Sequence, residues 1–173
     1  MKEFRNLIIL GPLIYAIHHF EEHIIFNFRE WRLKYFLDNN LLSTEEVLLR
    51  LLAVLLLMIF VHSIKRNKAS AQVILFFLMT TQVINAIFHI FFSFYYSDFS
   101  PGAITAVLLY LPINYFIFKA ALNEGYVNNL KEIGLIFVLG ATTFALFELI
   151  GPIVMMISLF LAVVYYAAAT KWG

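Results

Sequence analysis

The sequence predicts an all-α protein: a multi-pass bundle of membrane-spanning helices that forms a single transmembrane domain over residues 1–173. Two features of the composition indicate this class: 62% of the residues are hydrophobic, and only 13% are charged. Soluble domains carry about a quarter charged residues. The mean hydropathy of +0.86 points the same way. Apolar stretches of about 20 residues, the length needed to cross a bilayer, recur along the chain, and we count about six.

The first apolar stretch covers about residues 6–26. It follows a basic start, as a signal peptide would, but it lacks a small-residue cleavage site and ends in His and Glu, so we expect a retained membrane span. Residues 27–37 then mix aromatic with basic side chains. This mixture is typical of a helix lying in the headgroup layer, with Trp31 and Tyr35 as interfacial anchors.

The second span is expected from about residue 43 to residue 64. Ser43 and Glu46 have the spacing of a helix-capping box, and Arg50 lies four residues after Glu46, where the two side chains can pair. The third span covers about residues 71–95.

The fourth span, about residues 102–121, follows a Pro–Gly turn. The remaining apolar sequence is divided at Gly151 and Pro152, and proline disrupts the interior of a helix. We therefore expect a fifth span over residues 132–150 and a sixth over residues 152–170. One strongly kinked helix, which would leave five spans, is the alternative.

The distribution of basic residues predicts the orientation in a cell membrane. In the six-span arrangement most of them fall on one side, and by the positive-inside rule that side, with both termini, is cytoplasmic. These residues are Lys2, Arg5, Lys65, Arg66, Lys68, Lys119, Lys131 and Lys171. The net charge of only +1 argues against nucleic-acid binding. The sequence has no Cys, which excludes disulfides, thiolate metal ligands and thiol nucleophiles.

A dense group of ionisable residues ends the first span. On a helix that turns about 100° per residue, His18, Glu21 and Glu22 share one face, and His19 and His23 lie on the adjoining face. Charged groups are costly at membrane depth and usually face a bundle interior, a cavity or a bound ion. The pattern therefore predicts a buried polar site at this end of the span.

Polar residues of later spans are expected to meet this group. One face of the third span carries Gln82, Asn85, His89, Ser93 and Tyr96. Because successive spans alternate in direction, the His89 end of the third span and Glu148, near the end of the fifth, reach the same membrane face as His18. His62 lies at the opposite end, where we expect it at the interface.

Three elements of the sequence resemble the HXXEE family of small integral membrane proteins. The first is HHFEE at residues 18–22, which places His, Glu and Glu at the defining positions. The second is an N-x-x-x-H element at residues 85–89, and the third is the Pro–Gly turn and threonine within residues 100–105. The resemblance covers about residues 10–115. It implies a multi-pass membrane domain and no established activity.

A divalent metal site is the first functional hypothesis. Imidazole and carboxylate donors without sulfur suit zinc, iron or manganese, and helical bundles build metal sites from inward-facing Glu and His. The candidate ligands are His18, Glu21, Glu22, His89 and Glu148. The candidate catalytic residues are Glu21, Glu22 and Asn85. A lipid or another small apolar substrate would enter from the lipid bilayer, and hydrolysis or, with iron, oxidation would follow.

Several alternatives use the same residues. Without a metal, a His facing paired carboxylates can transfer protons, as in an isomerase of a hydrophobic substrate. A transporter, sensor or assembly factor is a non-enzymatic possibility, and a purely structural hydrogen-bonded group is another. His19 to His23 also fits the H-x-x-E-H signature of inverted zinc proteases, and the two histidines can equally sit among lipid headgroups. No organic cofactor is implied.

Overall fold

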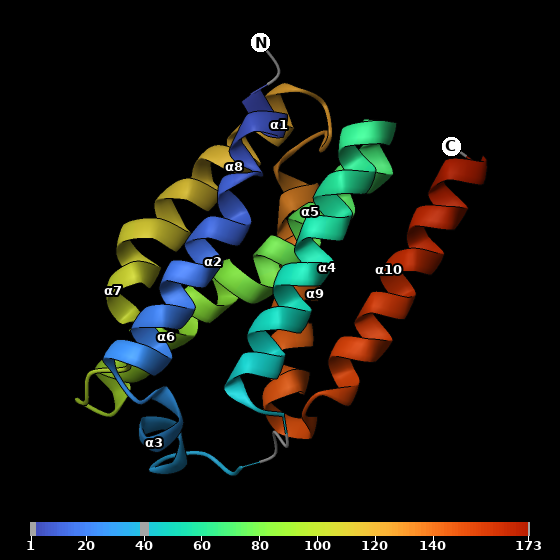
Figure 1. Cartoon of the computed structure of the whole chain (residues 1–173). Helices are drawn as coiled ribbons and strands as arrows, with labels where there is room; N and C mark the ends of the chain where they lie inside the picture. The colour runs from blue at the N-terminus through green and yellow to red at the C-terminus, as the bar shows by residue number, and fades with distance from the viewer. Residues whose placement is uncertain (1–2, 39–41, 173) are drawn as a thin grey trace.

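The computed structural model describes residues 3–38 and 42–172, and in this part of the chain all regular secondary structure is helical, without strands. This confirms the predicted all-α bundle (Figure 1). The elements labelled η are π-helical. In chain order the elements are α1 (Glu3–Leu7), α2 (Leu10–Phe20), η1 (Glu21–Ile25), α3 (Phe28–Leu33), α4 (Thr44–Lys65), α5 (Lys68–Leu78), η2 (Met79–Ile84), α6 (Asn85–Tyr95), α7 (Ala103–Thr105), η3 (Ala106–Tyr110), α8 (Leu111–Asn123), α9 (Leu130–Ile150) and α10 (Ile153–Trp172).

Within the described residues, five helices are long and apolar enough to cross a membrane. They are Glu45–Lys65, Lys68–Tyr95, Ala103–Asn123, Leu130–Ile150 and Ile153–Lys171. The segment predicted as a further span, α1 to η1, runs beside them along the bundle (Figure 1). It is interrupted by a turn at Ile8 and Ile9, so its continuous helices are shorter than the other five. Whether it crosses the bilayer stays a prediction.

The break between α9 and α10 occurs where the Gly–Pro pair predicts it. Gly151 has a positive φ of 94°, a conformation that glycine adopts without the steric cost of a Cβ. The chain reverses there, and α10 runs back beside α9 (Figure 1). The alternative of a single kinked helix is therefore wrong.

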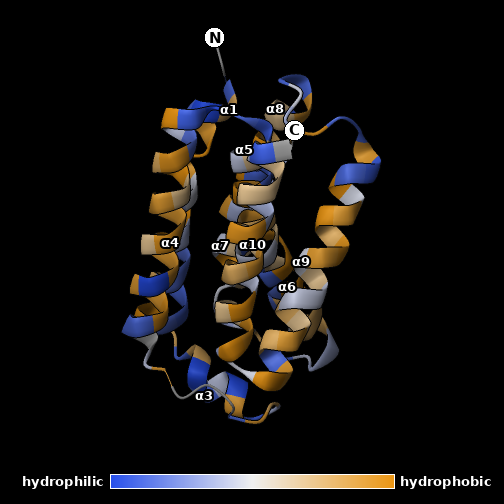
Figure 2. Ribbon diagram, turned by 90° about the vertical axis from the view of Figure 1, so that its right-hand side faces the viewer, coloured by the Kyte–Doolittle hydropathy of each residue, from blue (hydrophilic) through white to orange (hydrophobic). Residues whose placement is uncertain are grey.

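The surface of the bundle is that of a membrane protein. Apolar residues cover the middle of the helices, and hydrophilic residues gather toward the two ends (Figure 2). The described residues nearest the two termini lie at the same end (Figure 1). Which end faces the cytoplasm stays a prediction.

α9 packs closely against η2, which continues into the helix that carries Asn85 and His89. A Cβ on Gly140 would lie only 2.9 Å from Cγ of Met79 and 3.3 Å from Oγ1 of Thr80. Small residues permit such close helix contacts in membranes. α9 therefore fixes the position of η2, which directly precedes Asn85.

The helix expected in the headgroup layer lies across one end of the bundle as α3, and it is shorter than the predicted stretch of residues 27–37 (Figure 1). Trp31 was predicted as an interfacial anchor, and this is wrong, because its side chain is buried in the protein. The Trp31 ring packs among Phe28, Phe88 and other aromatic rings. α3 thus covers the end of the bundle where the predicted polar site lies.

Candidate metal centre

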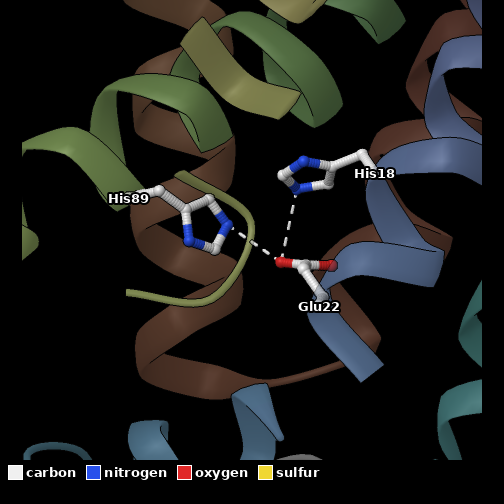
Figure 3. A group of neighbouring side chains, drawn as sticks. All are labelled: His18, Glu22 and His89. Atoms are coloured by element: carbon white, nitrogen blue, oxygen red, sulfur yellow. Dashed lines mark ion pairs between the residues drawn. The ribbon is translucent and has the colours of Figure 1, made fainter. Parts of the chain in front are cut away.

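Three buried side chains from three elements come together at the end of the bundle that α3 covers. His18 comes from α2, Glu22 from η1 and His89 from α6 (Figure 3). Oε1 of Glu22 lies 3.3 Å from Nε2 of His18 and 2.9 Å from Nε2 of His89. Despite these short separations, neither Nε2 atom has a partner with hydrogen-bond geometry among the described residues. The three side chains together could hold a metal ion.

The other nitrogen of each imidazole contacts a hydroxyl group. Nδ1 of His18 lies 2.7 Å from Oγ1 of Thr105, and Nδ1 of His89 lies 2.9 Å from Oγ of Ser100. Ser100 is itself positioned by Ser93, whose Oγ accepts from the Ser100 backbone N–H at 2.9 Å. The Ser93 hydroxyl donates to the carbonyl oxygen of His89 at 2.7 Å. Both ring orientations are therefore fixed by polar contacts.

Glu21 has a different role from Glu22. Its carboxylate accepts three backbone N–H groups, from Gly102 at 3.1 Å, Ile104 at 3.2 Å and Thr105 at 2.7 Å. These donors belong to the start of the helix that continues through α8, where unpaired N–H groups and the helix dipole favour a carboxylate. Glu21 thus fastens η1 to α7 and brings Thr105 to His18.

Gly102 packs directly on the three side chains. Its φ of +97° lies in the left-handed region. A Cβ there would come within 2.8 Å of Cε1 of His18, 2.9 Å of Cγ of Glu22 and 3.1 Å of Cε1 of His89. The Pro–Gly turn therefore needs glycine both for its conformation and for space.

The second oxygen of Glu22 faces another pair of imidazoles. Oε2 lies 3.9 Å from Nδ1 of His19 and 3.7 Å from Nε2 of His23, and the centroids of these two rings are 4.3 Å apart. His19 is buried and His23 is partly buried. The sequence left the roles of both histidines open, and the structure groups them with Glu22 as a second possible metal-binding set.

Two further polar groups lie at the cavity beside the His18 ring. The ring of Tyr110 lies 4.2 Å from that of His18, centroid to centroid. The Tyr110 hydroxyl and Oδ1 of Asn85 are buried and have no hydrogen-bond partner among the described residues. Both residues line the same cavity as His18 and Glu22. Buried polar groups without partners are rare and indicate a place where a polar ligand can bind.

A cavity of about 200 Å³ extends from this site into the bundle. Beyond its polar end it is mainly apolar, with lining side chains from α4, α5, α9 and α10, among them Leu51, Met58, Phe77, Phe144, Met155 and Leu159. α4 and α10 stand apart in both views of the molecule (Figures 1 and 2). The cavity is thus polar at one end and apolar along the rest.

Two of the predicted metal ligands are placed differently from the rest. Glu148 reaches the predicted end of the bundle and lines the cavity, but its Oε2 lies 2.9 Å from Nη2 of Arg32. Neither Glu148 nor Glu21 belongs to the two possible metal-binding sets among the described residues. Each carboxylate has a strong partner nearby: a guanidinium for Glu148 and backbone N–H groups for Glu21.

The expectation that His62 is interfacial is wrong. Its side chain is fully buried, with Nδ1 at 2.8 Å from Oγ of Ser70 and the ring packed edge-on against those of Phe4 and Tyr126. Arg50 pairs with Glu46 as expected, at 3.2 Å.

Sequence reasoning missed the residues that support the imidazoles. Thr105 was noted only as part of a motif, and Ser100 only as part of a turn. No periodicity identifies them, because they lie beside the turn and not on the polar face of a helix. Tyr110 carries no sequence signal, since it is one of nine tyrosines in an aromatic-rich chain.

A comparison with protein families identifies the group to which this arrangement belongs. The family model described as "protein of unknown function with HXXEE motif" matches residues 9–117, more than half of the chain. The chain belongs to the HXXEE family. No curated protein and no solved structure matches it. The matched range includes His18, Glu22, His89 and the turn at Gly102, but not α9 and α10.

Proposed function

We propose that this HXXEE protein binds a divalent transition metal, zinc or iron and less favourably manganese, between His18, Glu22 and His89. With this metal it would act on a lipid or another small apolar molecule. The observation that carries the proposal is the convergence of two buried imidazole Nε2 atoms on one carboxylate oxygen, at 3.3 Å and 2.9 Å. A cation between these atoms would satisfy all three.

The separations suit metal ligands. Two donor atoms that bind one ion at about 2.1 Å lie about 3.0 Å apart at octahedral angles and about 3.4 Å apart at tetrahedral angles. The Nε2–Oε1 separations of 3.3 Å to His18 and 2.9 Å to His89 are close to this range. The three donor atoms all lie within 4.8 Å of one another.

The hydroxyl contacts favour the tautomer that a metal requires. The Thr105 hydroxyl donates to the carbonyl oxygen of Gly102 at 3.3 Å, so its oxygen can accept from Nδ1–H of His18. A neutral His18 with a proton on Nδ1 presents the lone pair of Nε2 toward Glu22. Metal-binding histidines characteristically donate their second N–H in this way.

The arrangement leaves room for chemistry at the ion. Three protein ligands leave an open coordination position, as in catalytic and not structural zinc sites. A bound metal supplies an activated water for hydrolysis or, if it is iron, oxidation chemistry. Asn85 and Tyr110 offer unpartnered polar atoms at the cavity, where they would hold the polar group of a substrate.

The cavity supports an apolar substrate. Its long apolar part would hold an acyl or isoprenoid-like chain, while the reactive group faces His18 and Glu22. Because residues of both α4 and α10 line the cavity, we place the entrance between these two helices, facing the bilayer. Substrates of this kind are concentrated in the membrane and need no aqueous route.

Elemental analysis of the purified, tag-free protein tests the metal. We expect stoichiometric zinc or iron that is lost in His18→Gln and His89→Gln and retained in His62→Gln, a control that changes a buried histidine at the far end. Helical content and a monodisperse elution profile would establish that the variants fold. Metal that is absent from folded wild-type protein, or present but indifferent to His18 and His89, would overturn the proposal.

Extraction of bound lipid tests the cavity. Ser158→Trp and Ala162→Trp fill the cavity wall on α10, so we expect less co-purified lipid or isoprenoid by mass spectrometry. Phe160→Trp is the matched control, because Phe160 is exposed on the same helix. Equal amounts of retained lipid in all three variants would argue against this substrate class.

A metal-free acid–base function is the second candidate, and one distance favours it. The 2.9 Å separation between Nε2 of His89 and Oε1 of Glu22 is short enough for a direct imidazolium–carboxylate pair. In that case Glu22 would exchange protons with a hydrophobic substrate in the same cavity. Folded wild-type protein without metal, but with a bound apolar molecule, would select this function.

A further inference from the structure

We infer that Glu22 bridges two metal ions, and that His19 and His23 bind the second. This inference rests on the proposed function, because the first ion is the one between His18, Glu22 and His89. The second site would take the same class of ion, a divalent first-row transition metal. Four histidines and one carboxylate would then form a dinuclear centre.

The two oxygens of Glu22 separate the histidines into two pairs. Oε1 is the atom nearest to His18 and His89, and Oε2 is the atom nearest to His19 and His23. Figure 3 shows the second oxygen pointing away from the first pair. A carboxylate shared in this way can bind one ion through each oxygen, and ions in two-metal sites lie about 3.5–4 Å apart.

The donor atoms of the second set are slightly farther apart than the ligands of a bound metal ion would be. Its two nitrogen–oxygen separations, 3.9 Å and 3.7 Å, exceed the tetrahedral separation of about 3.4 Å by only a few tenths of an ångström. His19 and His23 are four residues apart, the spacing that brings two imidazoles to one ion on a helix. The second set is therefore looser than the first but similarly arranged.

The two sets of ligands share the same neighbouring residues and the same cavity. The ring of Phe28 on α3 lies 5.9 Å from the ring of His23 and 5.1 Å from the ring of His89, so one aromatic side chain covers a member of each set. Three of the four histidines, His18, His19 and His23, come from the consecutive helical segments α2 and η1. His18, His19, His23 and Glu22 also line the same cavity. A substrate group in the cavity would face both ions.

The metal content of the tag-free, full-length protein in detergent tests the inference. After loading with Mn²⁺ and removal of loosely bound ions, we expect two ions per chain in the wild type. The double variant H19Q/H23Q should retain one, H18Q/H89Q should retain at most one, and Glu22→Gln should lose both. His62→Gln is the matched control and should keep two.

Electron paramagnetic resonance on the same Mn²⁺-loaded samples provides a second readout. Two ions that share a carboxylate couple magnetically, so we expect a coupled spectrum in the wild type and the six-line spectrum of an isolated ion in H19Q/H23Q. This readout on the wild type does not depend on whether any variant folds.

The outcomes distinguish the inference from the proposed function. One ion per chain that is lost in H18Q/H89Q but unchanged in H19Q/H23Q would overturn the dinuclear centre and leave the proposed function intact. One ion that depends only on His19 and His23 would overturn both. Two ions with an uncoupled spectrum would overturn the bridging role of Glu22.

Discussion

Buried histidines occur at both ends of this bundle. Nδ1 of the ring contacts a hydroxyl group at both ends, but the surroundings of the rest of the ring differ. At one end, Nδ1 of His62 contacts the hydroxyl of Ser70; at the other, Nδ1 of His18 contacts that of Thr105. The ring of His62 packs edge-on against two aromatic rings, whereas Nε2 of His18 faces a carboxylate oxygen. Among the described residues, only the second arrangement belongs to a possible metal-binding set.

Burial and a hydroxyl partner alone do not distinguish the candidate metal ligand His18 from His62. Both environments provide them. What distinguishes the His18 end is convergence, since several donor atoms point at one oxygen, and a cavity reaches that point. We therefore propose that His62 contributes to packing, whereas the histidines at the His18 end bind a ligand.

The largest expected effect comes from Glu22→Gln. The amide keeps the shape of the side chain but removes the negative charge that faces all four imidazoles. Metal affinity should therefore fall by more than about 100-fold, because losing a residue that only contacts a metal ligand already costs up to about that much. Competition titration with a chelating dye measures the affinity. A loss of under tenfold would place the metal elsewhere.

Gly102→Ala should have the next largest effect. The added Cβ collides with all three side chains of the first set, and a displacement of about 1 Å at a site costs on the order of 100-fold. Gly125→Ala is the matched control, because Gly125 has a φ of +76° with nothing within 4 Å of the new Cβ. The control should keep full metal affinity and lose only about 1–2 kcal/mol of stability from backbone strain. Equal metal affinities in the two variants would contradict the close approach.

Thr105→Val and Ser70→Ala compare the two hydroxyl partners directly. Removing the hydroxyl beside His18 should lower metal affinity by about 10–100-fold. Removing the one beside His62 should leave metal affinity unchanged and lower the free energy of unfolding by about 1–3 kcal/mol. Thermal unfolding and metal titration of both variants check this pair, and an unchanged affinity in Thr105→Val would remove the basis for the assigned tautomer.

The smallest effect is expected at Glu148, which pairs with Arg32. Glu148→Gln should leave metal affinity unchanged, since the carboxylate pairs with Arg32 and links α9 to α3. A clear loss of metal would restore Glu148 as a ligand.

The sequence predicted the architecture and much of the site, because both follow from patterns along single helices. The lengths of the apolar stretches predicted the five helices that are long and apolar enough to cross a membrane, the Gly151–Pro152 pair predicted the last break, and helical periodicity brought His18 and Glu22 to one face. The alternating direction of the spans then placed His89 at the same end. These inferences need only geometry within a helix and the order of the helices.

The remainder depended on contacts between segments. Glu21 and Glu22 are adjacent and chemically identical, yet backbone N–H groups of a distant turn bind one, and imidazoles surround the other. Local π-helical turns at Glu21–Ile25 and Met79–Ile84 also change the helical phase, and such turns often occur at functional sites. Trp31 was misplaced because α3 covers protein and not lipid. None of these contacts leaves a periodic signal.

Anomalous X-ray scattering from metal-loaded crystals would locate the ion itself. We expect a peak at the absorption edge of the bound metal, about 2.0–2.2 Å from Nε2 of His18, Nε2 of His89 and Oε1 of Glu22. A metal peak elsewhere, with Glu22 hydrogen-bonded directly to His89, would contradict the proposed site.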